Sequence, residues 1–469
     1  MKRIGRYEIC GLLGRGGMSV VYRARLPQLG KLVALKLLHP HPHLRQQLGL
    51  EELRQRFLAE AKTMAQLHHP NVVEVWDFDE FDGQPFLVME YYCNNLGLLI
   101  GETYRLENPS RPLPTPQVIR YARQILAGLA RLHHADIIHR DLKPFNILLT
   151  EEDIGKISDF GLSRLRGEVW SGPRTLMVGS PYYAAPEQEQ DPNIVDARSD
   201  LYAVGIMLYR MLSGRLPEAH SPSLLPITTN SADASPSTGQ PGIAARDLDR
   251  AWAAFFVKAI ATDPANRFAS ATSMAKSLDE LDELWGELVR TTCTAPPVDV
   301  SRSRPGPPQA SSVRYQPLKI SPENAPADFD VDPLWRPRSW VSLVYREGSN
   351  GVVIEAATRR VWQRSGSPYP MSWQEAHHYV NHLNEDRFAD ISSWRLPTIS
   401  ELLLLITAVP GSGALCTRSP FDPTQRYLWS ADRRSFAAAW FLSAELGFVG
   451  WQDFTCRLHV RAVSFLSES

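Results

Sequence analysis

The sequence predicts an α+β protein with two folded regions and a linker between them. Strand-type runs and helical periodicity alternate in the first region, and short strands with one clear helix return in the second. A chain of 469 residues with 43% hydrophobic content can bury more than one core. Nine of the 36 prolines fall between Thr291 and Arg336. We therefore predict domains at 1–290 and 336–469, joined by a proline-rich linker at 291–335.

The first element is a glycine turn between two strand-type runs. Gly14, Gly16 and Gly17 follow an apolar run that ends at Leu13, and Val21 lies in the run that comes next. Glycine has no Cβ, so the backbone N–H groups of such a turn can approach phosphate oxygens. Taken alone, the pattern fits an ordinary hairpin as well as a phosphate-binding loop. Its interpretation depends on the motifs that follow.

A lysine on the next strand and a glutamate on the next helix predict an ion pair. Ala34 and Lys36 belong to a short strand-type run. The helix is indicated by apolar residues at helical spacing, namely Phe57, Ala61, Met64 and Leu67. Glu60 lies in that helix and can project toward Lys36. Without each other, both residues would be ordinary surface charges.

A polar segment in the middle of the chain carries the strongest chemical signal. It runs from His139 to Asn146 with the sequence H-R-D-L-K-P-F-N, and D-F-G follows at Asp159. These residues place a base, a cation and two oxygen ligands for a metal in one short stretch. Upstream, Phe86 to Tyr92 predicts a buried strand that ends in a hinge.

Together these motifs resemble those of protein kinases, and the glycine turn resembles that of bacterial serine/threonine kinases related to the eukaryotic ones. The resemblance implies a two-lobed kinase fold that transfers the γ-phosphoryl group of ATP, with Mg²⁺ as cofactor. It implies Asp141 as the base for the attacking hydroxyl and Lys143 as the cation beside the moving phosphoryl group. Asn146 and Asp159 are the implied metal ligands. The implied ATP-binding residues are Leu13, Gly14, Gly16, Gly17, Val21, Ala34, Lys36, Glu60, Met89, Glu90 and Tyr92.

Three further residues match the scaffold of the family. Asp200 opens an apolar helix. The resemblance implies that it braces the backbone of the segment from His139 to Asn146, which we call the catalytic segment. Glu187 of the A-P-E triplet is expected to pair with Arg267.

Two positions concern the substrate and the control of activity. Lys143, two residues after the implied base, is the serine/threonine pattern, so protein substrates with Ser or Thr hydroxyls are expected. Arg140 corresponds to the arginine that pairs with a phosphorylated residue in the segment before A-P-E. We predict autophosphorylation at Ser171 or Thr175. The competing class is a pseudokinase scaffold, against which the complete set of site residues argues.

Three segments depart from the kinase pattern. Asn95 to Pro116 is longer than the usual connection, and we predict a surface insertion near the substrate mouth. His220 to Gly242 is rich in serine, proline and threonine where kinases carry a docking helix, so that helix is missing or replaced by a loop. His39, His41 and His43 alternate with prolines, which favours a loop over a transition-metal site.

Charge and cysteine usage exclude some partners and compartments. The formal net charge of −1 gives no field that would attract nucleic acid. The five cysteines lack C-x-x-C spacing, which fits a reducing cytoplasm. Whether Cys416 and Cys456 pair stays open. No window reaches the ~20 apolar residues of a membrane span, so a cytoplasmic protein is expected.

The C-terminal region has a different character. A helix is predicted from Ser372, with Glu375 completing a capping box. The sequence W-R-L-P-T from Trp394, followed by Glu401, by W-S and by a final V-R-x-V, resembles the Lcl-type C-terminal domain. That resemblance implies a C-type-lectin-like fold that serves recognition or sensing. Trp394, Arg395 and Glu401 are interpreted as fold anchors. The aromatic residues Trp440, Phe441, Trp451 and Phe454 either form a binding face or pack inside.

Overall fold

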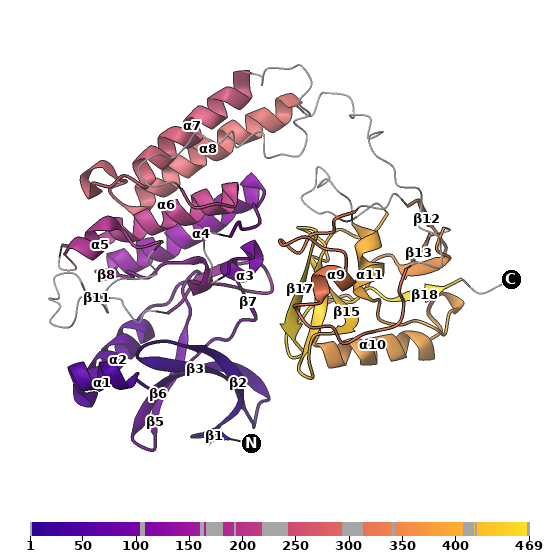
Figure 1. Ribbon diagram of the computed structural model, residues 1–469, viewed down its shortest axis with the longest axis horizontal. Coiled ribbons are helices and arrows are strands. Elements are labelled where there is room, and N and C mark those ends of the chain that lie inside the picture. Colours follow the sequence, from indigo (N-terminus) through magenta and orange to yellow (C-terminus); the bar gives the residue numbers. More distant parts are fainter. Residues whose placement is uncertain are drawn as a thin grey trace. The chain divides into compact units, whose positions relative to one another are not determined.

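The chain forms two compact units, Met1–Ala295 and Pro296–Ser469 (Figure 1). The computed structural model describes residues 2–103, 108–159, 164–165, 182–191, 194–217, 243–292, 313–339, 343–355, 357–406, 417 and 420–466. The predictions made for Ser171, Thr175, Cys416 and the segment 220–242 fall outside these residues. Within the described part of the chain, no helix is long and apolar enough to cross a membrane.

A six-stranded antiparallel sheet opens the first unit, with the strand order β1-β2-β3-β4-β6-β5. The strands are β1 (Arg3–Ile4), β2 (Tyr7–Arg15), β3 (Ser19–Leu26), β4 (Lys31–Leu38), β5 (Val75–Phe81) and β6 (Gln84–Met89). Helices α1 (Pro42–Leu48) and α2 (Leu50–Ala65) connect β4 to β5. The predicted helix is therefore confirmed and begins earlier than its apolar pattern indicated. Phe57 of α2 packs in one core cluster with Leu87 of β6.

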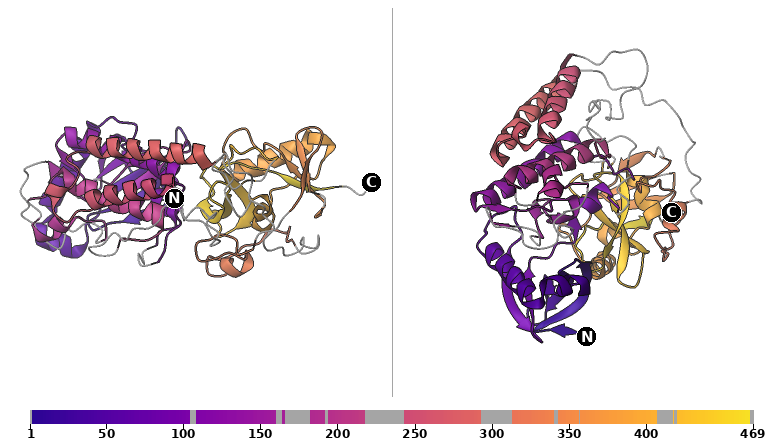
Figure 2. Two further views of the ribbon diagram at one scale, coloured as in Figure 1. Left: turned by 90° about the horizontal axis from the view of Figure 1, so that it is seen from above. Right: turned by 60° about the vertical axis from the view of Figure 1, so that its left-hand side comes forward.

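The remainder of the first unit is mainly helical (Figure 2). Its helices are α3 (Leu96–Ile100), α4 (Thr115–His134), α5 (Pro186–Gln190), α6 (Ala197–Ser213), α7 (Ile243–Ala259) and α8 (Ala271–Thr292). Helix α6 is buried along most of its length, because nearly all of its residues from Leu201 onward are apolar and packed. The catalytic segment lies among short elements, namely β7 (Asn94–Asn95), β8 (Ile137–Ile138), the 3-10 turn η1 (Pro144–Asn146), β9 (Ile147–Leu149), β10 (Gly155–Ile157) and β11 (Arg164–Leu165). Another 3-10 turn, η4 (Pro264–Asn266), precedes α8.

The second unit contains two antiparallel sheets, in the orders β12-β13-β14-β18 and β15-β16-β17. The strands are β12 (Tyr345–Glu347), β13 (Val352–Glu355), β14 (Arg360–Gln363), β15 (Tyr427–Arg433), β16 (Ala438–Ser443), β17 (Phe448–Asp453) and β18 (Val463–Phe465). The helical elements are α9 (Ala325–Asp328), α10 (Trp373–Glu385), η6 (Phe388–Asp390), α11 (Ile399–Leu402) and η7 (Leu403–Leu405). Trp362, Leu402 and Trp440 meet in one core that joins both sheets to α11.

The start of α10 confirms the predicted capping box. The Ser372 hydroxyl accepts a hydrogen bond from the Glu375 N–H at 3.3 Å. The Glu375 carboxylate accepts one from the Ser372 N–H at 2.7 Å. Two backbone donors that helix geometry leaves unpaired are thereby satisfied.

The predicted linker is too long at its C-terminal end. Residues 313–335 pack into the second unit, where Ile320 is 3% exposed and Phe329 meets the Trp440 ring edge-on at 5.1 Å. The Ile320 N–H donates to the Arg433 carbonyl at 2.8 Å. The apolar residues of this segment follow neither the strand period nor the helix period, because each of them packs into the core of the second unit separately. Its prolines made an ordered segment look like a linker.

Two of the four aromatic residues that were predicted to form a binding face or to pack inside lie in the core of the second unit. Trp440 and Phe441 lie on β16, not in loops, and are 0% and 5% exposed. Trp451 of β17 contacts the Trp440 ring at 5.3 Å. Trp440 and Phe441 therefore pack inside, whereas Trp451 and Phe454 are only partly buried.

Candidate active site

Lys36, Glu60 and Asp159 come together from three separate elements. Lys36 lies on β4 and Glu60 on α2, and the Lys36 ammonium is 2.6 Å from the Glu60 carboxylate. The same ammonium is 3.0 Å from Asp159, which follows β10. The predicted pairing of lysine and glutamate is present, and Asp159 is its third member.

This cluster is buried on one side and open on the other. The Lys36 side chain is 4% exposed, whereas that of Asp159 is 51% exposed. The Lys36 ammonium holds the pKa of Asp159 at about 2, so this carboxylate is ionised at neutral pH. Burial alone would lower the pKa of Lys36, but Asp159 and Glu60 raise it above its ordinary value. The buried Lys36 ammonium therefore lies beside the ionised carboxylate of Asp159, whose side chain reaches solvent.

The catalytic segment places Asp141, Lys143 and Asn146 within hydrogen-bonding distance of one another. The Lys143 ammonium is 2.8 Å from the Asp141 carboxylate. The Asn146 amide nitrogen donates to the Asp141 backbone carbonyl at 2.7 Å. Because that nitrogen is engaged, the amide oxygen of Asn146 is the side-chain atom left to face a cation. The η1 turn, which begins at Pro144, sets this spacing.

Asp200 holds the backbone that carries these residues. Its carboxylate oxygens accept hydrogen bonds from the N–H groups of His139 and Arg140, both at 2.9 Å. Arg140 has a φ of 68°, a conformation that costs free energy for a non-glycine residue. Burial would raise the pKa of Asp200, but the contact with His133 at 2.8 Å helps hold it below the usual range. The implied brace is present, and it stabilises a strained backbone.

The A-P-E triplet is tied to the same scaffold. Arg267 donates to both carboxylate oxygens of Glu187 at 2.7 Å, as the sequence predicts. The Gln188 amide donates to the Arg140 carbonyl at 3.0 Å. Gln188, which follows the A-P-E triplet, is therefore tied to the segment that contains Asp141.

The residues that the resemblance implies for ATP binding lie in the glycine turn, on β3 and β4, and at the hinge that follows β6. The Gly16 N–H donates to the Ser19 carbonyl at 2.9 Å, and Gly14 pairs with Val21 in the β2–β3 register. A Cβ added to Gly14 or Gly17 would meet no atom within 4 Å, so the space beside this turn is open. Ala34 and Met89 are 6% and 7% exposed and share one apolar cluster, against which Val21 packs. Leu13 is 46% exposed.

At the hinge, the Glu90 side chain is already engaged. Its carboxylate accepts hydrogen bonds from the Lys156 ammonium at 2.9 Å and from the Glu74 N–H at 3.1 Å. The Lys156 ammonium also lies 5.7 Å from the centre of the Tyr92 ring. Contacts of Glu90 with a ligand therefore fall to its backbone.

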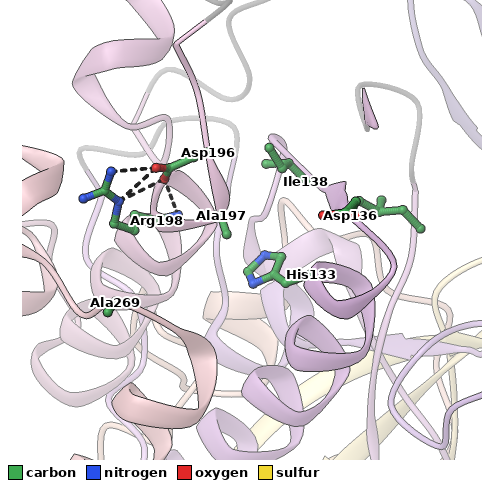
Figure 3. A pocket seen from close by; sticks show the side chains of 8 residues that line it. His133, Asp136, Ile138, Asp196, Ala197, Arg198 and Ala269 are labelled. Carbon is green, nitrogen blue, oxygen red and sulfur yellow. Dashed lines mark hydrogen bonds and ion pairs between the residues drawn. The ribbon is translucent and has the colours of Figure 1, made fainter. Parts of the chain in front are cut away.

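A cavity of about 160 Å³ lies behind the catalytic segment (Figure 3). His133, Ile138 and the ion pair between Asp196 and Arg198 line it. Sequence reasoning missed His133, which lies beside His134 at the end of the amphipathic helix α4 and carries no motif of its own. The cavity borders the Asp200 brace and not the reacting groups.

His39 and His41 lie between β4 and α1, whereas His43 lies in the first turn of α1, so the predicted loop is wrong from Pro42 onward. The rings of His41 and His43 stack with their centres 5.5 Å apart. Over the part of the chain that the structure describes, no three His, Cys, Asp or Glu side chains are grouped to hold a metal ion.

The family model described as "Protein kinase domain" matches residues 7–277, which is more than half of the chain. The chain belongs to the protein kinase family. A second model, "Lcl C-terminal domain", matches residues 351–464.

Relatives of this kinase-family chain include two bacterial serine/threonine-protein kinases. Serine/threonine-protein kinase pkn3 of Myxococcus xanthus is 33% identical over 59% of this chain and 50% of its own length. Serine/threonine-protein kinase PksC of Streptomyces coelicolor is 38% identical over 58% of this chain and 48% of its own length. The chain therefore spans about half the length of these relatives.

Proposed function

We propose that this chain is an ATP-dependent serine/threonine protein kinase. The observation that carries the proposal is the contact of Lys36 with both Glu60 and Asp159. In active kinases, the lysine–glutamate pair and the metal-binding aspartate must both be in place. Here Lys36, Glu60 and Asp159 meet, and Asp141 lies in the segment that Asp200 braces.

ATP and Mg²⁺ fit the donor set. Asp159 and the amide oxygen of Asn146 are hard oxygen ligands of the kind Mg²⁺ prefers. When bound, the metal neutralises charge on the phosphates. Lys36 would hold the α- and β-phosphates, and the open turn of Gly14, Gly16 and Gly17 would cover them. The purine would lie between the Val21–Ala34 side and Met89, against the backbone of Glu90 and Tyr92, with Leu13 at the rim.

Asp141 would orient the acceptor hydroxyl and take its proton, while Lys143 would stabilise the charge on the transferring group. The lysine two residues after the base supports Ser and Thr hydroxyls as acceptors. Both residues are partly exposed, at 12% and 25% for Asp141 and Lys143, so a protein substrate can reach them. Ser171 and Thr175, which fall outside the described residues, remain the proposed autophosphorylation sites.

For the second unit we propose a recognition or sensing module of C-type-lectin-like type. The match to the Lcl C-terminal domain supports a separate module. The ligand of this module is a protein or another molecule that the kinase must reach. Recruitment of a substrate by such a module raises its effective concentration. Direct regulation of the kinase is the alternative role.

The test is transfer of labelled phosphate from ATP with Mg²⁺ by the full chain and by its Asp141→Asn variant. We expect the variant to lose activity by several orders of magnitude while it still binds nucleotide, because the base acts mainly in the transition state. The matched control is Asp82→Asn, which changes an exposed turn aspartate with a φ of 51° that asparagine tolerates. A wild-type chain that binds ATP but transfers nothing would be a pseudokinase scaffold.

A further inference from the structure

The turn between β15 and β16 carries an apolar side chain that solvent surrounds. Phe436 is 84% exposed, the largest exposed fraction among the large apolar side chains that the structure describes. A single exposed apolar residue is common on protein surfaces. Here a second one lies on the neighbouring segment, because the Leu318 carbonyl accepts a hydrogen bond from the Arg433 N–H at 2.9 Å and the Leu318 side chain is 45% exposed. Two apolar side chains therefore lie at one end of this sheet.

Hydrogen bonds order this turn. The Arg434 N–H donates to the Ala438 carbonyl at 2.9 Å. The Phe454 N–H, just after β17, donates to the Ala437 carbonyl at 2.8 Å and ties the turn to the next strand. Phe436 is therefore presented by an ordered backbone, so little conformational freedom is left to lose when its side chain binds a partner.

Three cationic side chains lie on the turn and on the segment beside it. The Lys319 ammonium is 3.8 Å from the centre of the Phe436 ring. Arg433, at the end of β15, is exposed and is the partner of Lys319 in a β-bridge. The Arg434 guanidinium is 4.6 Å from the centre of the Trp451 ring. Among the described residues, none of these three cations forms an ion pair with a carboxylate.

The carboxylates next to this turn leave a positive charge. Asp432 is 0% exposed, and both of its oxygens accept hydrogen bonds from Arg314. Asp453 lies opposite Ala438 in the β16–β17 register, and its carboxylate accepts hydrogen bonds from the Thr455 N–H and hydroxyl. Three cations therefore face one partly exposed carboxylate, and the local charge is positive although the whole chain carries −1.

An exposed apolar side chain with cations around it fits an anionic lipid surface. A protein partner would have to supply a pocket for Phe436, whereas a lipid surface receives an apolar side chain at the boundary between headgroups and acyl chains. Anionic headgroups attract the neighbouring lysine and arginine side chains. Such side chains can also keep their charged ends in the headgroup region while their stems cover apolar surface.

We propose that this turn docks the second unit on a membrane surface that contains anionic lipid. Phe436 and Leu318 supply the apolar contacts, and Lys319, Arg433 and Arg434 supply the charge. A set of this size makes a weak and reversible anchor. The proposal goes beyond the kinase function and does not depend on it, because binding to lipid is measured without ATP.

The test is sedimentation of the full chain with vesicles of phosphatidylcholine, either pure or mixed with phosphatidylglycerol. We expect binding to the mixed vesicles only, and weaker binding as salt rises, because salt screens exposed charges. Phe436→Ser should lower the partition coefficient for mixed vesicles by about tenfold, whereas Phe436→Leu should retain most of it. Arg433→Gln should lower it by about fivefold, the effect of one charge near an anionic surface.

Two exposed residues of the same unit provide matched controls. Val344→Ser removes an apolar side chain that is 72% exposed, and Arg346→Gln removes an exposed charge on β12, in the other sheet. Both variants should bind mixed vesicles as tightly as wild type. Because Phe436 and Arg433 are exposed, their variants should unfold at the same urea concentration as wild type.

Several results would overturn the proposal. They are equal binding to both kinds of vesicle, binding to neither, or Phe436→Ser protein that binds mixed vesicles as tightly as Val344→Ser protein. Soluble poly-glutamate tests the other class of partner. If it binds as tightly as the mixed vesicles do, and Phe436→Ser changes neither affinity, the cations serve an acidic polymer and docking on lipid is wrong. Phosphoryl transfer to a peptide without lipid is a separate measurement, so the kinase function can fail or hold independently.

Discussion

One charged cluster from each unit illustrates two different arrangements of buried charge. In the first unit, the buried Lys36 contacts Asp159, whose side chain is 51% exposed. In the second, Glu401 is 0% exposed and accepts hydrogen bonds from Arg360 at 2.9 Å and from Arg395 at 2.6 Å. The cluster around Lys36 includes a carboxylate that is half exposed to solvent. The Glu401 carboxylate, by contrast, is surrounded by hydrogen-bond donors of the protein.

A second carboxylate of the C-terminal unit follows the same rule. Asp432 is 0% exposed and takes both nitrogens of Arg314, at 2.7 and 2.9 Å. It also accepts from the backbone N–H groups of Leu318 and Ile399. Every oxygen of this carboxylate is engaged, so the group ties segments of the fold together. The comparison indicates that an incomplete cluster serves chemistry and a complete one serves architecture.

The largest expected effect on turnover comes from removing the charge of Asp159. Asp159→Asn removes the anionic metal ligand and one partner of Lys36. Metal charge stabilisation is worth several kcal/mol, so we expect turnover to fall by about 10³-fold. Turnover measured over a range of Mg²⁺ concentrations checks this, and saturating Mg²⁺ should not restore the rate. Near-normal turnover at high Mg²⁺ would show that Asp159 is dispensable as a ligand.

The next effect concerns the closed cluster. Glu401→Gln leaves Arg360 buried beside a neutral side chain, and removing one partner of a buried pair costs about 3–5 kcal/mol. We expect the free energy of unfolding of the second unit to fall by that amount, with kinase turnover unchanged. Urea denaturation followed by tryptophan fluorescence measures it. The control is Glu385→Gln, a glutamate of α10 that is 70% exposed. Loss of turnover with unchanged stability would reverse the assignment of the two clusters.

A third prediction separates the units by truncation. A cut at Arg336 would remove Ile320 and Phe329 from the core that they complete, so the chain must end before residue 313. A chain that stops at Thr292 should phosphorylate a small peptide as fast as the full chain. Phosphorylation of the cellular substrate should fall if the second unit recruits it. A loss of peptide turnover as well would favour direct regulation.

The smallest effect is a pH dependence of the second unit. Burial would raise the pKa of Glu401, but Arg395, the Thr398 N–H and Arg360 hold it below the usual range. A depressed folded-state pKa gives stability that is complete above the unfolded value of 4.5 and is lost as pH falls below it. We expect unfolding free energy to decrease by up to about 1.4 kcal/mol per pH unit through this group. The slope should be shallower in Glu401→Gln, as urea titrations at several pH values can establish.

Local sequence was sufficient for the parts of the site that motifs encode. The pairing of Lys36 with Glu60 and the contact of Glu187 with Arg267 were both predicted, because each residue lies in a recognisable pattern. The buried hydrogen bond from the Tyr183 hydroxyl to the Glu102 carboxylate was not predicted, since the two residues are 81 positions apart and carry no shared period. Likewise, the order of 313–335 depends on tertiary contacts that its proline-rich composition conceals. Such long-range polar contacts need a structure to be found.

Phosphoryl transfer to Ser or Thr by the site around Lys36, Glu60 and Asp159 can be measured directly. The full chain is incubated with γ-labelled ATP, Mg²⁺ and a protein acceptor, and the labelled amino acids are identified after hydrolysis. We expect phosphoserine or phosphothreonine from the wild-type chain and none above background from Asp141→Asn. Label on tyrosine alone, or equal label from both chains, would contradict it.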